Sequence, residues 1–243
     1  MSRLKKILIG LLIFVGGIAV AGGVIFFLFV QEMKGDPKEE EKIRQEAEQY
    51  VREHFEAGTT SVYDVFYDNM GNFGYFEYAA NVHHEEYGTN FLVYFDKEKG
   101  QMVDTFISAK WRDEAEKAIQ PYINEKLGES LTLRDMEPII HSDDWDEIEA
   151  FMKGKIELNV LFDDGIGKEL DVDPNNPVSY TELGASPDII IVTIPRKKQA
   201  SDEAIFNDII QSLQDDGILK HGNIRFEYYD MGVPLEEDVE KSF

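Results

Sequence analysis

The chain has 243 residues, a formal net charge of −24 at pH 7 and no cysteine. The negative charge opposes binding to nucleic acid and to anionic lipid headgroups, and the lack of thiols excludes disulfides and cysteine catalysis. Hydrophobic residues make up 43% of the chain and aromatic residues 12%, which is enough to build folded cores, so extensive disorder is also excluded.

The run from Ile7 to Val30 contains no charged residue and follows Arg3, Lys5 and Lys6. As a helix it would span roughly 36 Å, enough to cross the hydrocarbon core of a bilayer. The run therefore predicts a transmembrane helix, with residues 1–35 forming a cytoplasmic tail and membrane anchor. Because the basic residues precede it, the positive-inside rule predicts a single-pass protein of the cell membrane, with a cytoplasmic N-terminus and extracytoplasmic C-terminal domains.

A cleaved signal peptide is the alternative for this segment. Ala19, Val20 and Ala21 form the A-x-A pattern of a cleavage site behind a basic stretch. The apolar run continues well beyond Ala21, so cleavage there would leave an apolar tail on the product. This continuation favours a retained anchor.

Residues 36–127 predict a first folded unit. Apolar residues recur at helical spacing after Pro37 and stop at Gly58. Four short runs rich in Val, Phe and Tyr follow, and the short loops between them predict an antiparallel meander. The runs are SVYDVFY at 61–67, FGYFEYAANV at 73–82, NFLVYF at 90–95 and QMVDTFI at 101–107. A second helix, starting near Ser108, completes this unit.

Residues 128–243 predict a second unit. The segment at 155–162 alternates between apolar and polar residues as a strand does, and the apolar run at 188–194 is typical of a central strand. An amphipathic helix ending at Gly217 and a strand at 223–231 follow. The predicted fold class is α+β, with an N-terminal transmembrane helix followed by two small antiparallel-sheet-plus-helix units.

This layout resembles that of single-pass membrane-anchored extracytoplasmic proteins of Gram-positive bacteria. In those proteins a short basic tail and one helix carry small domains of the cystatin-like or peptidase-propeptide-like kind. The resemblance covers the architecture and no specific family motif. It implies a protein of the bacterial envelope and names no activity.

The loop at 171–182 has the ligand spacing of an EF-hand calcium site. Oxygen-bearing side chains fall at its positions 1, 3, 5, 9 and 12, namely Asp171, Asp173, Asn175, Ser179 and Glu182. Position 6 is Asn176 where the EF-hand has glycine, and Pro174 and Pro177 stiffen the loop. A calcium site with these five ligands is one interpretation, and a solvated turn is the other.

His83 and His84 form the only pair of adjacent histidines, and Glu86 follows them. Neighbouring residues of a strand point to opposite faces, so a surface hairpin tip is favoured over a metal site formed by these three residues. The chain contains no G-x-S-x-G, H-E-x-x-H or phosphate-binding glycine motif.

We therefore expect a binding module of the bacterial envelope and not an enzyme. Its expected partner is another envelope protein or a peptide, docked on an exposed face or edge of a sheet. No cofactor is expected unless the loop at 171–182 binds calcium. Two alternatives remain open: a calcium-dependent sensor or scaffold using that loop, and an envelope hydrolase with a metal held by His83, His84 and Glu86.

Overall fold

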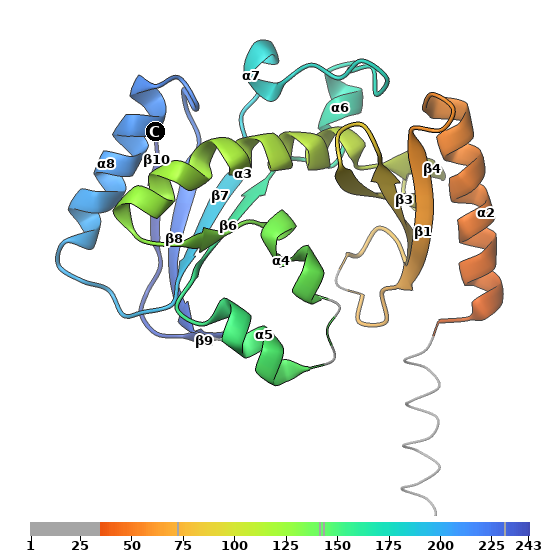
Figure 1. Cartoon of the computed structure of the whole chain (residues 1–243). Coiled ribbons are helices and arrows are strands. Elements are labelled where there is room, and N and C mark those ends of the chain that lie inside the picture. The colour runs from red at the N-terminus through yellow and green to blue at the C-terminus, as the bar shows by residue number, and fades with distance from the viewer. Residues whose placement is uncertain (1–34, 72, 141, 143, 231) are drawn as a thin grey trace, which may run out of the picture. The chain divides into compact units, whose positions relative to one another are not determined.

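The computed structural model describes residues 35–71, 73–140, 142, 144–230 and 232–243 (Figure 1). The helices are α2 (Pro37–His54), α3 (Phe106–Lys126), α4 (Leu133–Ile140), α5 (Trp145–Met152), α6 (Ile166–Glu169), α7 (Tyr180–Leu183) and α8 (Asp202–Asp215). The strands are β1 (Thr60–Tyr67), β2 (Tyr78–His84), β3 (Thr89–Asp96), β4 (Gln101–Asp104), β5 (Ser130–Leu131), β6 (Ile156–Leu161), β7 (Ile189–Ile194), β8 (Asn223–Asp230), β9 (Val233–Pro234) and β10 (Val239–Ser242).

The described chain groups into two compact units. The first comprises residues 35–53, 62–82 and 92–103, and the second comprises residues 54–61, 83–91 and 104–243. The long helix α3, which the sequence analysis grouped with the meander, belongs to the second unit.

The first unit is built on α2 and on most of a four-stranded sheet. The sheet has the order β1-β2-β3-β4, as expected for a meander with short loops. Helix α2 buries Ile43, Ala47 and Val51, which recur at the spacing of one helix face. A small aromatic core forms in the sheet, where the ring centroids of Phe76 and Tyr94 lie 4.6 Å apart.

The second unit contains a six-stranded sheet with the order β10-β8-β7-β6-β5, and β9 pairs with β8. The prediction of two antiparallel sheets is wrong here, because β5 pairs with β6 and β7 pairs with β8 in parallel. Helices lie between the strands of each parallel pair: α4 and α5 between β5 and β6, and α8 between β7 and β8. A helical crossover carries the chain back to the end of the sheet at which the first strand began, so the next strand runs in the same direction.

One face of this sheet forms the main core of the second unit. Its inward residues, including Leu158, Val192 and Phe226, are fully buried. Helices α3 and α8 pack together, and α3 lies against β6 (Figure 1). The ring of Phe206 on α8 stacks on Phe226, with centroids 3.7 Å apart and planes 5° from parallel. Alternation along the strands therefore places apolar side chains under the helices. The other face carries polar side chains, such as Glu157, together with apolar ones, such as Ile189 and Ile191.

The predicted membrane topology needs correction. Within the ranges that the structure describes, no helix is both long enough and apolar enough to span a bilayer. This finding contradicts the fold class with its transmembrane helix and the localisation as a single-pass membrane protein. The run at 7–30, from which both were predicted, lies outside the described residues.

Candidate functional site

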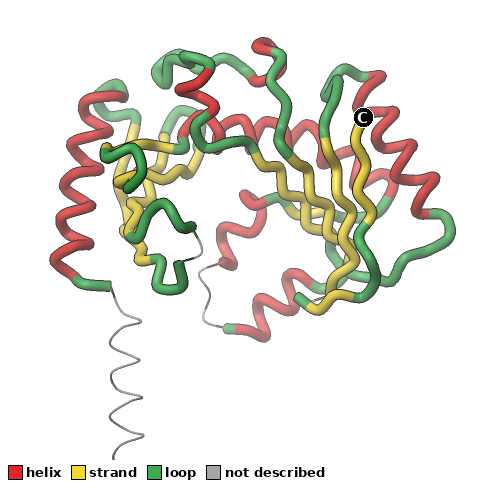
Figure 2. Tube along the Cα trace, turned by 180° about the vertical axis from the view of Figure 1, so that it is seen from behind, coloured by secondary structure: helices red, strands yellow, loops and turns green. Residues whose placement is uncertain are grey.

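The face of the second sheet opposite α3 is the candidate site. Figure 2 views the protein from behind, and there the strands of the second sheet lie in front with no helix drawn over their central part. The register pairs Glu157 on β6 with Thr193 on β7, and Thr193 with Glu227 on β8. Paired residues share a face, so two carboxyl groups and a hydroxyl form a row across three neighbouring strands.

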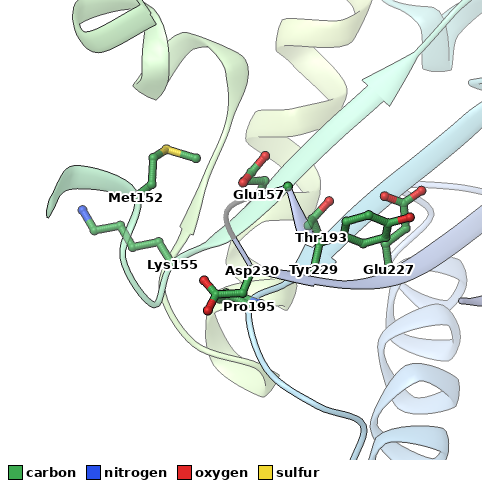
Figure 3. Close-up of a pocket in the computed structure, with 9 residues that line it drawn as sticks. Met152, Lys155, Glu157, Thr193, Pro195, Glu227, Tyr229 and Asp230 are labelled. Carbon is green, nitrogen blue, oxygen red and sulfur yellow. The ribbon is translucent and has the colours of Figure 1, made fainter. Parts of the chain in front are cut away.

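This row forms part of a hollow of about 230 Å³. The lining residues come from β6, β7, β8 and the segments beside them: Met152, Lys155, Glu157, Thr193, Pro195, Glu227, Tyr229, Asp230 and Gly232. Figure 3 shows the side chains of Glu157, Thr193 and Glu227 directed to the same side of the sheet. The hollow thus combines acidic groups with the ring of Tyr229 and the apolar side chains of Met152 and Pro195.

Glu157 is the most unusual residue of this hollow. Burial raises the pKa of its carboxyl group, and the nearby charge of Glu227 raises it further. The side chain is half-buried, and among the described residues it has neither a hydrogen-bond donor nor a cationic partner. A partly desolvated carboxylate beside a second carboxylate is stabilised by a ligand that brings positive charge and hydrogen-bond donors.

The cations near the hollow are already engaged with other groups. The Nζ atom of Lys155 lies 3.2 Å from Oε1 of Glu129 and 4.6 Å from the ring centroid of Phe151. The Nη1 atom of Arg225 lies 3.6 Å from Oε1 of Glu227, and its Nη2 atom lies 3.8 Å from Oε2 of Glu240. None of these four contacts involves Glu157, so no cation of the described chain neutralises the charge of its carboxylate.

The predicted calcium ligands do not converge in the structure. Asp173 accepts a hydrogen bond from the backbone N–H of Asn175 at 2.9 Å, the hydroxyl of Ser179 contacts that of Thr181, and Glu182 is exposed on α7. Asp171 adopts a positive φ of 53°. Throughout the described ranges, no three His, Asp or Glu side chains form a group able to hold a metal ion. Calcium binding by this loop thus stays a prediction.

Asn175 makes two hydrogen bonds to a distant segment of the second unit. Its amide oxygen accepts the N–H of Glu56 at 2.7 Å, and its amide nitrogen donates to the carbonyl of His54 at 2.9 Å. Asn175→Ala is expected to lower the free energy of unfolding by about 1–2 kcal/mol, because both bonds are lost. Urea unfolding measures this change, with Asn176→Ala as the control. Equal stability of Asn175→Ala and the wild type would contradict this role.

The histidine pair points in two directions, as strand geometry requires. The Nδ1 atom of His83 lies 2.7 Å from the amide oxygen of Asn90. His84 is 2% exposed and stacks on Phe106 with centroids 4.8 Å apart, and its burial lowers the pKa of the imidazole. The two histidines and Glu86 therefore do not form a metal site in the described chain.

A serine–histidine contact that the sequence analysis did not anticipate joins two loops of the second unit. The hydroxyl of Ser186 lies 3.2 Å from Nε2 of His221, beside a small cavity of about 30 Å³. Within the described chain, no carboxylate contacts His221 to orient its ring, and this histidine is exposed. The pair lacks the third group of a catalytic triad, which orients the histidine that activates the serine.

The hollow was not predicted from the sequence. A signal for it exists, because Glu157 and Glu227 occupy the polar positions of strands whose other positions are apolar. Their proximity depends on β7 lying between β6 and β8, which alternation within a strand does not reveal.

Comparison of the chain with models of known families, with curated proteins and with solved structures gave no match. The architectural resemblance to anchored proteins with cystatin-like or propeptide-like domains therefore stays a prediction. The candidate site rests on the geometry alone.

Proposed function

We propose that the protein is an interaction module that binds a positively charged group of a partner protein on the open face of its second sheet. The observation that carries this proposal is the half-buried carboxylate of Glu157, which lies beside Glu227 in the hollow and has no partner within the described chain. A cationic side chain would supply the missing hydrogen bonds and offset the repulsion between the two carboxylates.

The charge of the whole chain supports the same partner chemistry. With a formal charge of −24, the protein attracts basic partners and repels acidic ones during approach. Long-range attraction of this kind raises the association rate, whereas the hollow provides the contact at which a particular group is held.

The arrangement favours binding over catalysis. A carboxyl group of raised pKa beside a second carboxylate can serve in acid–base chemistry. The hollow, however, contributes no activated nucleophile, and the contact between Ser186 and His221 belongs to a different set of lining residues. The second carboxylate is itself held by Arg225. Binding of a cation needs the two carboxylates and does not need a nucleophile.

The double substitution of Glu157 and Glu227 by glutamine is expected to weaken binding of a cationic peptide at least about tenfold. Hydrogen bonds to charged groups contribute about 1.5–3 kcal/mol each, and about 1.4 kcal/mol corresponds to tenfold in affinity. The measurement is calorimetric titration of the full-length chain with the blocked peptide acetyl-Gly-Arg-Gly-Lys-Gly-amide. The analogue with glutamine at both basic positions is expected not to bind.

Glu169→Gln combined with Glu98→Gln is the matched control, because it removes the same charge from exposed positions outside the hollow. This control should change the affinity less than twofold. An equal loss in both double variants would attribute binding to the general charge of the protein and refute the site. Equal binding of the basic peptide and its glutamine analogue would refute the proposal itself.

A further inference from the structure

We infer that the hollow on the second sheet takes the guanidinium group of an arginine side chain, in preference to a lysine ammonium or a metal ion. This inference rests on the proposed function and specifies the partner group. Three features of the hollow support it: the row of Glu157, Thr193 and Glu227, the ring of Tyr229, and the size of the space.

A ligand of this row must contact two carboxylates that lie on different strands. Glu157 and Glu227 lie on strands that flank β7, so their backbones are roughly 9.5 Å apart, which is two strand spacings. Guanidinium is planar and carries five N–H donors pointing in different directions, which allows it to bridge two acceptors. Ammonium is a compact point charge and satisfies neighbouring acceptors only when they lie close together.

Tyr229 provides the second feature. It lies on β8 two residues after Glu227, so alternation places both side chains on the same face of the sheet, and both line the hollow (Figure 3). Guanidinium groups stack on aromatic faces, and they lose less hydration in doing so than ammonium groups. The apolar side chains of Met152 and Pro195 offer contacts for the methylene stem of the same ligand.

The volume of the hollow is larger than a single ion requires. The hollow of about 230 Å³ exceeds by several fold the ~30 Å³ share of one water molecule. A group of several non-hydrogen atoms fits this space, whereas a bare divalent ion needs three or more ligands close together. Within the described ranges no such group of side chains occurs.

Arg225, the arginine of the protein that contacts Glu227, does not bind Glu157. Arg225 precedes Glu227 on the same face and contacts Glu227 and Glu240, and neither of its recorded ion pairs involves Glu157. An incoming arginine would therefore satisfy Glu157 and share Glu227 with Arg225. This arrangement predicts that Glu157 contributes more to selectivity for arginine than Glu227 does.

The test uses the full-length chain labelled with ¹³C at its methionine methyl groups, of which the sequence has seven. Met152 lines the hollow and reports on its occupancy, whereas Met70 is 75% exposed in the first unit and serves as the reference signal. The ligands are blocked Gly-X-Gly tripeptides in which X is arginine, lysine or citrulline. Citrulline keeps the shape of arginine but carries no charge.

The expected result is a saturable shift of the Met152 signal with the arginine peptide, at an affinity at least threefold above that of the lysine peptide and tenfold above that of the citrulline peptide. Glu157→Gln should abolish the preference for arginine over lysine. Tyr229→Leu should weaken arginine binding, whereas Tyr229→Phe should preserve it because the ring remains.

Equal affinities for the arginine and lysine peptides would overturn the inference and leave the proposed function standing, since a cation would still bind. Equal affinities for the arginine and citrulline peptides would overturn both, because charge would then play no part. Binding of arginine that moves no Met152 signal would place its site elsewhere and refute the assignment to this hollow.

Discussion

Glu116→Gln is expected to raise the free energy of unfolding by about 3 kcal/mol at pH 8, and by no more than about 1 kcal/mol at pH 5. Glu116 lies on α3 and is 1% exposed. One carboxyl oxygen accepts the N–H of Val160 at 3.3 Å, and the other has no hydrogen-bond partner in the described chain. Replacing the carboxyl group by an amide removes a group whose charged form the protein solvates poorly.

The sign of the effect follows from the pKa of this group. Burial raises the pKa of Glu116 from 4.5 to about 7, against the opposing effects of Arg112 and the Val160 hydrogen bond. The folded protein therefore favours the neutral carboxyl group. The stabilisation associated with the neutral form is fully present below pH 4.5 and is lost as the pH rises through 7. One pKa unit corresponds to about 1.36 kcal/mol, which sets the expected size.

Urea unfolding of the wild type and the variant at pH 5, 6, 7 and 8 measures this effect. The difference in unfolding free energy should grow with pH and level off above pH 7. Glu125→Gln, at an exposed position near the end of the same helix, is the control and should leave the pH dependence unchanged. A difference that stays constant from pH 5 to pH 8 would show that Glu116 does not titrate in this range.

Asp202→Ala is expected to lower the free energy of unfolding by about 3–5 kcal/mol, the usual cost of breaking a buried ion pair from one side. Asp202 is fully buried at the start of α8. Both terminal nitrogens of the Arg196 guanidinium donate to it at 2.9 Å, the backbone N–H of Gln199 donates at 2.9 Å, and the hydroxyl of Tyr228 donates at 3.0 Å. The substitution leaves these donors without their acceptor.

The position of this network explains its importance. Arg196 follows β7, Asp202 begins α8 and Tyr228 belongs to β8, so the network joins all three elements of the parallel crossover. Burial raises the pKa of Asp202, yet the hydrogen bonds from Arg196, Gln199 and Tyr228 outweigh burial and lower it overall. The stabilisation is therefore present above the pKa of the unfolded state, near 3.8, and is lost as the pH falls through the folded pKa.

Two further variants separate the parts of this effect. Tyr228→Phe removes one hydrogen bond and should cost about 1 kcal/mol. Arg196→Ala combined with Asp202→Ala should cost clearly less than the sum of the two single changes, because the double variant leaves no buried carboxylate without its cationic partner. Chemical unfolding of the four proteins in this cycle gives the coupling. Additive costs would contradict a direct interaction between the two side chains.

Local pattern in the sequence was sufficient for several of the elements, but not for the short helices α6 and α7 or the strands β9 and β10. Alternation in the segments at 155–162 and 223–231 predicted strands, and apolar residues at helical spacing predicted the helix that ends before Gly217; the structure has β6, β8 and α8 in these places. These patterns predict the elements because each element buries one face. The apolar residues of that face recur at the period of a helix or a strand. An α+β fold with two sheets followed from them, whereas the transmembrane helix and the all-antiparallel pairing did not hold.

The tertiary structure decided what the charged residues do. In the sequence, Glu116, Glu157 and Asp202 look like solvated acids of an acidic protein, and only packing shows that two are buried and the third lines a hollow. The pairing of Glu157 with Glu227 across Thr193 arises because β7 lies between β6 and β8 in the sheet. Periodicity fixes which way a side chain points from its own element, but the neighbours of that element are chosen by contacts between segments far apart in the chain.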